Sequence, residues 1–162
     1  MREAIQCLSQ DGYITVVPSK GFTLRKLNEE DMEESIQIRC AIEGFCIHKA
    51  AAEAGTRKGQ KLLSAMEKLL DKQEKTLLSK NGPSRENLES GNFNSAGLDQ
   101  FTEYDHQFHL ALVNYVDNRE FNQMFQRLTY LIHLTTKGAL SVPGRMEDTL
   151  GEHRQFFACL KA

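Results

Sequence analysis

Apolar residues recur at three- and four-residue spacing through most of the chain from residue 28 onward, and this periodicity constrains the fold most strongly. Such spacing lines one face of an α-helix with side chains that pack against a core. Residues 80–97 are polar and rich in Gly, Asn and Ser, which predicts a loop. The sequence therefore predicts an all-α fold, an antiparallel helical bundle. The expected helices cover residues 28–54, 59–78, 98–116, 119–137 and 146–161.

A short N-terminal segment precedes these helices and has a different pattern. Residues 2–12, "REAIQCLSQDG", look like the end of a helix that Gly12 closes. Residues 13–24, "YITVVPSKGFTL", place β-rich residues on both sides of a turn and predict a hairpin. The residues of that turn are Ser19, Lys20 and Gly21.

Composition and charge exclude several classes of protein. The 162 residues carry a formal net charge of -2, which is not typical of a protein that coats nucleic acid or a membrane surface. No apolar run approaches the roughly 20 residues of a membrane-spanning helix, and the N-terminus lacks a signal-peptide pattern. The cysteines have neither metal-site spacing nor the density of a secreted scaffold; they are Cys7, Cys40, Cys46 and Cys159. We therefore expect a cytoplasmic protein with reduced thiols, in which Cys40 and Cys46 are small buried side chains.

Ionisable side chains fall inside the apolar faces of two of the later predicted helices. Asp105 and His109, one helical turn apart, project into the apolar arc of residues 98–116. His153 lies at the centre of the apolar side of residues 146–161. These positions would normally hold core residues, so the three side chains are candidates for a buried functional site.

The first long helix repeats this arrangement with an arginine and a glutamate. Arg39 and Glu43 fall inside its apolar arc. A charge in a bundle core costs several kcal/mol unless it is paired or bound to a metal, so such groups should contact one another. The apolar face of this helix is expected to run through Met32, Ile36, Cys40 and Ile47.

Two interpretations of the inward-facing groups follow from the residues alone. In the first they form a buried polar network, in which Asp105 orients His109 and Arg39 pairs with Glu43. In the second, one carboxylate and two imidazoles bind a divalent transition metal, for which zinc, nickel, manganese and iron are candidates. His106, at the edge of the arc, fits a rim residue better than a ligand. The ligands of the second interpretation are Asp105, His109 and His153.

A metal with three protein ligands keeps open positions, which permits either catalysis or the binding of an anionic ligand. Arg39 adds a fixed cation whose planar fork matches a carboxylate. Together they predict a site for a small organic acid, with binding favoured over turnover. The alternative is a metal-dependent enzyme that uses the same Asp/His/His set. A non-haem iron centre of that composition usually lies in a β-barrel, which this sequence does not predict.

Several segments resemble a known family, in the same order along the chain. Residues 1–27, "MREAIQCLSQDGYITVVPSKGFTLRKL", are similar to the end of the winged helix-turn-helix of GntR-superfamily bacterial transcriptional regulators. The helical effector-binding domain of the FadR-type branch, called FCD, is similar to four later segments: "IQIRCAIEGFCIHKAAAEA", "YDHQFHLALV", "DNREFNQMFQRL" and "GRMEDTLGEHRQFFACLKA". The resemblance covers nearly the whole chain except residues 80–97. It divides the chain into a partial winged helix-turn-helix domain, residues 1–27, and an FCD-like domain, residues 28–162.

The resemblance implies a ligand-responsive regulator, not an enzyme, that binds operator DNA as a homodimer and has no membrane partner. It implies a divalent transition metal, zinc or nickel before others, and a small carboxylate effector. Arg39 is the residue implied for the effector's carboxylate. The implied metal ligands are Asp105, His109 and His153. The residues implied for DNA binding match the late recognition helix and the wing tip, namely Arg2, Ser19, Lys20 and Gly21.

The resemblance also predicts a chain truncated at both ends. Relatives have two more helices before the segment that begins at Met1, and a further helix with another histidine ligand beyond Ala162. A chain of this extent is expected to bind operator DNA weakly or not at all by itself. Its metal would have three protein ligands, with water or the effector completing the shell. A remaining alternative is an inactive regulator fragment that folds but senses nothing.

Overall fold

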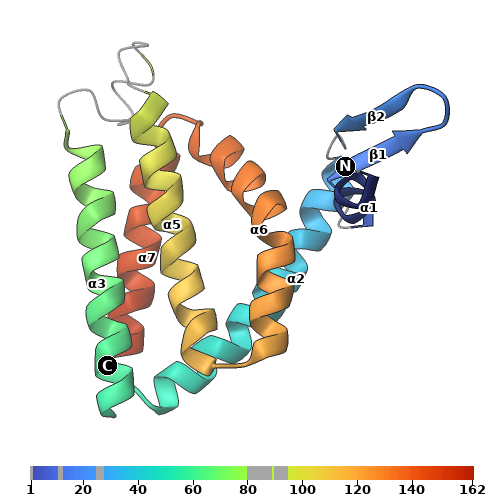
Figure 1. Cartoon of the computed structure of the whole chain (residues 1–162). Coiled ribbons are helices and arrows are strands. Elements are labelled where there is room, and N and C mark those ends of the chain that lie inside the picture. Colours follow the sequence, from blue (N-terminus) through green and yellow to red (C-terminus); the bar gives the residue numbers. More distant parts are fainter. Residues whose placement is uncertain (1, 11–12, 25–27, 80–88, 90–94) are drawn as a thin grey trace.

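The computed structural model describes residues 2–10, 13–24, 28–79, 89 and 95–162 (Figure 1). Gly12 and most of the predicted loop at 80–97 lie outside the described residues. A helical bundle dominates the described part, as predicted, and a two-stranded sheet precedes it in the sequence. None of the described helices is long and apolar enough to cross a membrane.

The predicted long helices are present, with small differences at their ends. Within the described residues they are α2 (Glu29–Ala52), α3 (Arg57–Leu77), α5 (Ser95–Val116), α6 (Arg119–Leu140) and α7 (Arg145–Lys161). Helix α5 begins at Ser95 rather than at residue 98, inside the segment that the sequence assigned to a loop. Helix α6 continues past residue 137 to Leu140, because Leu140 is buried in the core and its packing favours a further helical turn.

Side chains at the start of α2 and α3 determine where these helices begin. Asn28 and Asp31 form a capping box, in which each side chain accepts a hydrogen bond from the backbone N–H of the other. Thr56 caps α3 by accepting a hydrogen bond from the Gly59 N–H at 3.0 Å. A Cβ atom on Gly59 would lie 2.2 Å from the carbonyl oxygen of Glu53. Only glycine therefore allows α3 to start this close to the end of α2.

Helix α5 is the centre of the bundle. It packs against α2, α3 and α6, and α7 packs mainly against α3 (Figure 1). The apolar arc predicted for α5 is buried, as predicted: Leu98, Phe101, Phe108, Leu112 and Val116. Because α5 contacts so many neighbours, a polar side chain on its inner face lies where several helices can supply partners.

The buried face of α2 differs from the predicted one. Ile36 is 52% exposed and Cys40 is exposed, so the prediction that both face the core was wrong. Cys46 is fully buried, as predicted. Apolar residues occur all round α2, so periodicity alone does not select the side that meets α5. The buried residues of α2 are Ser35, Ile42, Glu43, Cys46 and Ala50.

The N-terminal segment forms the predicted helix and hairpin, at the N-terminal end of α2 in Figure 1. Its strands are antiparallel, with Val17 opposite Gly21, and Lys20 N–H donates to the Val17 carbonyl oxygen at 3.0 Å. Pro18 followed by Ser19, whose φ is 61°, gives this turn the proline and the positive φ that are typical of type II. The elements are α1 (Arg2–Gln10), β1 (Ile14–Val17) and β2 (Gly21–Leu24).

Candidate metal centre and ligand cavity

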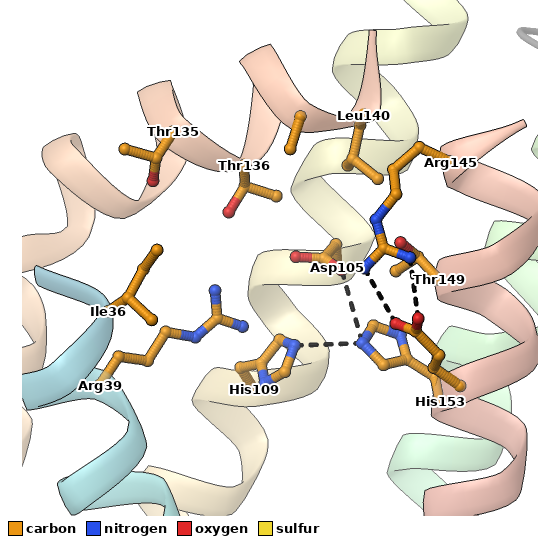
Figure 2. Close-up of a pocket in the computed structure, with 12 residues that line it drawn as sticks. Ile36, Arg39, Asp105, His109, Thr135, Thr136, Leu140, Arg145, Thr149 and His153 are labelled. Atoms are coloured by element: carbon orange, nitrogen blue, oxygen red, sulfur yellow. Dashed lines mark hydrogen bonds and ion pairs between the residues drawn. The ribbon is translucent and has the colours of Figure 1, made fainter. Parts of the chain in front are cut away.

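Three potential metal ligands meet between α5 and α7 (Figure 2). Asp105 and His109 project one turn apart from α5, and His153 faces them from α7. The Nε2 atoms of His109 and His153 are 3.2 Å apart, and Asp105 Oδ1 lies 3.6 Å from His153 Nε2. One ligand atom from each residue lies within 4.8 Å of the other two. The fold thus brings together the three residues that were predicted from the sequence as ligands.

The outer nitrogen of each imidazole faces an oxygen acceptor. His109 Nδ1 lies 2.7 Å from Glu43 Oε2, and His153 Nδ1 lies 3.4 Å from Gln73 Oε1. With a proton on each Nδ1, both contacts are hydrogen bonds and both Nε2 lone pairs point toward the space between the rings. The Phe108 ring stacks on His153, with 4.5 Å between ring centroids, and restrains the imidazole plane.

This arrangement fits a divalent transition metal. Two unprotonated Nε2 atoms 3.2 Å apart repel each other, and a cation that binds both lone pairs removes the repulsion. Two nitrogens bound to one zinc ion at about 2.0–2.1 Å, with a tetrahedral angle between them, lie roughly 3.3 Å apart, close to this separation. Asp105 adds the anionic oxygen that such sites often contain. The Asp/His/His group could therefore hold a metal ion.

Burial and neighbouring charges set the protonation of this cluster. Burial, followed by the charge of His109, lowers the pKa of His153 to about 3, so its imidazole is neutral near neutral pH. Burial raises the pKa of Asp105, and the charge of His109 opposes part of that rise. Burial also acts to raise the pKa of Glu43, but the hydrogen bond with His109 and the nearby charges outweigh it and lower the pKa overall. A neutral imidazole is the form of histidine that ligates a metal.

Glu43 joins the cluster to Arg39. Arg39 Nε donates to Glu43 Oε1 at 2.6 Å, while Glu43 Oε2 contacts His109. The predicted pairing of Arg39 with Glu43 is confirmed. The carboxylate at His109 Nδ1 is Glu43 rather than Asp105, because Asp105 is directed across the interface toward His153. Within the described part of the chain, the terminal nitrogens of Arg39 make no hydrogen bond, and the side chain lines a cavity.

The cavity beside the cluster has a volume of about 330 Å³ (Figure 2). This volume falls in the range of small-molecule sites. Helices α2, α5, α6 and α7 all contribute to its walls. Besides Arg39 and the three potential ligands, the polar side chains of its lining are Thr135, Thr136, Arg145, Thr149 and Glu152.

These additional polar residues were not predicted. Arg145 and Thr149 precede His153 at intervals of four residues, so all three share one face of a helix. This spacing could have been used to predict Arg145 and Thr149 from His153. Thr135 and Thr136 offered no such signal, because their position in the wall depends on how α6 packs. Gln73 had a weak signal, as a polar residue on the apolar face of α3, where it is fully buried.

The predicted DNA-contacting residues lie in α1 and at the tip of the hairpin. Arg2 is exposed at the start of α1, Ser19 and Lys20 are exposed in the turn between the strands, and Gly21 is exposed as the first residue of β2. Their contact with DNA stays a prediction. His106 lies outside the Asp/His/His group; it is half-buried and stacks on Phe125, with 5.8 Å between ring centroids.

Two comparisons with known proteins place the chain in a family. Residues 34–162 match the model of the FCD domain. Over 161 residues the chain is 26% identical to the uncharacterized HTH-type transcriptional regulator YdhC of Bacillus subtilis (strain 168). That match covers 99% of this chain and 63% of the relative, so the chain spans less than two thirds of the relative's length. The chain therefore belongs to the FCD domain family, in agreement with its resemblance to GntR-superfamily regulators of the FadR type.

Proposed function

We propose that this helical domain senses a small organic acid for a bacterial transcriptional regulator of the GntR superfamily. The Asp105, His109 and His153 side chains bind a divalent transition metal, zinc or nickel, and the metal and Arg39 together hold the acid's carboxylate. The acid is bound and released unchanged, and its binding alters the affinity of the intact regulator for operator DNA. The family match and the similarity to an HTH-type regulator support this role.

One observation carries the metal in this proposal: the Nε2 atoms of His109 and His153 face each other at 3.2 Å while Glu43 and Gln73 occupy the two Nδ1 atoms. A polar network without metal would need a proton between the two Nε2 atoms. The ring that carries this proton is then either a cation in a mostly buried site, which is costly, or a neutral tautomer that no longer donates from Nδ1 to its oxygen acceptor. A metal ion satisfies both lone pairs, and the neighbouring carboxylates compensate its charge.

The cavity and its arginine support an acidic effector. Glu43 engages Arg39 Nε and so fixes the guanidinium plane, which leaves the terminal nitrogens for a ligand in the cavity. A metal with three protein ligands supplies a second cation with open positions for the same carboxylate. A volume of about 330 Å³ suits a small molecule rather than a long acyl chain.

Regulation requires the intact protein. The intact regulator acts in the cytoplasm as a homodimer. Its residues at the DNA backbone or minor groove are Arg2, Ser19, Lys20 and Gly21, which are all exposed. Because coupling between two ligands is reciprocal, operator DNA changes the affinity for the acid by the same factor as the acid changes the affinity for DNA.

Thermal unfolding of the purified chain with lactate, malate or gluconate tests the effector site. At least one acid is expected to raise the Tm of the metal-loaded chain by several degrees, and not that of the chain treated with a chelator. Arg39→Gln is expected to lose most of this gain while keeping its metal. Arg127→Gln, which removes an exposed arginine of α6, is the matched control. Stabilisation that is equal with and without metal, or absent with every acid, would contradict the proposal.

A further inference from the structure

A second arginine of the cavity already holds a carboxylate. Arg145 donates from Nη1 to Glu152 Oε1 at 2.8 Å and from Nη2 to Glu152 Oε2 at 3.0 Å, so the pair is bidentate. Both residues line the cavity, and Figure 2 shows the two contacts as dashed lines from Arg145. The Glu152 carboxylate thus marks a place in the cavity wall where a planar carboxylate fits an arginine.

This ion pair is easily exchanged for another. The side chains of Arg145 and Glu152 are 40% and 58% exposed, so water and salt screen their attraction. Both belong to α7, so breaking the pair requires no movement of one helix against another. Arg145 can then turn its fork to a carboxylate inside the cavity, while Glu152 turns to solvent.

Two threonine hydroxyls in the cavity wall lack the hydrogen bond within the helix that other helical threonines make. Within the described residues, Thr136 and Thr149 make no hydrogen bond, although Thr149 is only 7% exposed. A buried or half-buried hydroxyl normally finds a partner, and since both residues line the cavity, water or a ligand inside it can supply one. The helical threonines that donate to a carbonyl oxygen of their own helix are Thr76, Thr102, Thr129 and Thr135.

The charges around the cavity favour a doubly charged ligand. Arg39 and Arg145 balance Asp105 and Glu152, so a divalent metal leaves two positive charges in the lining. Glu43, behind Arg39, reduces this excess to one. When Glu152 leaves Arg145 for solvent, the excess is two again, which a ligand with two carboxylates neutralises.

We propose that the effector carries two acidic groups and that its second carboxylate replaces Glu152 on Arg145. This inference rests on the proposed function, in which the metal and Arg39 hold the first carboxylate. Arg39 on α2 and Arg145 on α7 belong to different walls of one cavity, so a single small dicarboxylate can engage both. Glu152 acts as an internal competitor that keeps Arg145 paired when the cavity holds no acid.

Malate and 2-hydroxybutyrate are a matched pair of probes, because they differ only in whether a carboxylate or a methyl group ends the molecule. The affinity of each for the metal-loaded 162-residue chain is measured by calorimetry. Malate is expected to bind roughly tenfold or more tightly than 2-hydroxybutyrate, as one added arginine–carboxylate pair would provide.

Two variants test the roles of the ion pair. Arg145→Gln is expected to abolish the advantage of malate over 2-hydroxybutyrate, so that the ratio of the two affinities falls to about one. Glu152→Gln is expected to bind malate several-fold more tightly, because Arg145 no longer has a competing carboxylate, and to increase the ratio of the malate affinity to the 2-hydroxybutyrate affinity. Glu152 is exposed, so this variant should fold like the parent chain, which circular dichroism checks.

The outcomes separate this inference from the function on which it rests. Equal affinities for the two acids, or a Glu152→Gln variant that binds malate no more tightly, would overturn the inference and leave the proposed function intact. If neither acid bound a chain that retains its metal, while lactate or gluconate did, the dicarboxylate would likewise be excluded. If no acid bound at all, the proposed function would fail together with the inference.

Discussion

Glu43 on α2 lies 2.7 Å from His109 on α5, across 66 residues of sequence. The other oxygen of the same carboxylate accepts a hydrogen bond from Arg39. One buried side chain therefore orients both a candidate metal ligand and the arginine proposed for the effector. If effector binding moved Arg39, the Glu43 carboxylate would move with it and change the position of His109.

Glu43→Gln should weaken metal binding, because it removes the negative charge that supports the Nδ1 proton of His109 while nearly keeping the side-chain volume. Loss of such an outer partner is expected to reduce the affinity for zinc roughly 10- to 100-fold. Competition with a chelating dye measures the change. Glu34→Gln, which alters an exposed glutamate of the same helix, is the control. If both variants bound zinc like the parent chain, Glu43 would have no role at the metal.

The stability of the metal-free chain should fall as the pH falls. Folded His153 has a pKa of about 3, against an ordinary value of 6.5, so below 6.5 the unfolded state binds the extra proton. The free energy of unfolding therefore decreases with falling pH across this window, by at most about 1.4 kcal/mol per pH unit for this group. The raised pKa of Asp105 has the opposite sign and is expected to offset part of the slope.

Urea unfolding with a chelator present, at about pH 7, 6 and 5, measures that slope. His153→Gln is expected to flatten it, whereas His48→Gln, at an exposed site on α2, should leave it unchanged. An identical slope in the parent chain and in His153→Gln would show that His153 is not held neutral by burial.

Gly59→Ala should destabilise the junction of α2 and α3, because the new Cβ would lie 2.2 Å from the Glu53 carbonyl oxygen and force the backbone to shift. The expected loss is about 1–3 kcal/mol in the free energy of unfolding. Gly151→Ala on α7 meets no atom within 4 Å and should stabilise the chain by roughly 0.5–1 kcal/mol. Chemical denaturation of both variants gives the comparison, and a loss at Gly151 as large as at Gly59 would contradict it.

If Lys20 contacts the DNA backbone as proposed, Lys20→Ala in the intact regulator should weaken operator binding about equally for all DNA sequences, because phosphates carry no sequence information. The slope of log affinity against log salt concentration is expected to fall by about one. Lys61→Ala, at an exposed site on α3, is the control. An unchanged salt slope in Lys20→Ala would remove the hairpin tip from the DNA interface.

Much of the fold was predictable from local pattern. The apolar arc of α5 and the N-terminal hairpin depend on residues close in sequence, and both are present as predicted. The face of α2 was not predictable, because its apolar residues surround the helix and only the packing of α5 selects Cys46 over Cys40 for burial.

The same limit applies to the site. Asp105 and His109 share one helix face at a spacing of four, and His153 stands out on an apolar helix face, so the sequence could nominate all three. The partners of their outer nitrogens come from other helices: Glu43 is 66 residues from His109, and Gln73 is 80 residues from His153. Such pairings depend on the register of packed helices, which a single sequence does not reveal.

Metal content is the most direct test of the central claim. Elemental analysis of the purified chain is compared with His109→Ala, His153→Ala and the control His48→Ala. About one transition-metal ion per chain is expected in the parent and the control, and a large loss in the other two variants. If the parent chain held no metal even after incubation with zinc or nickel, or if all four proteins held the same amount, the metal centre would be contradicted.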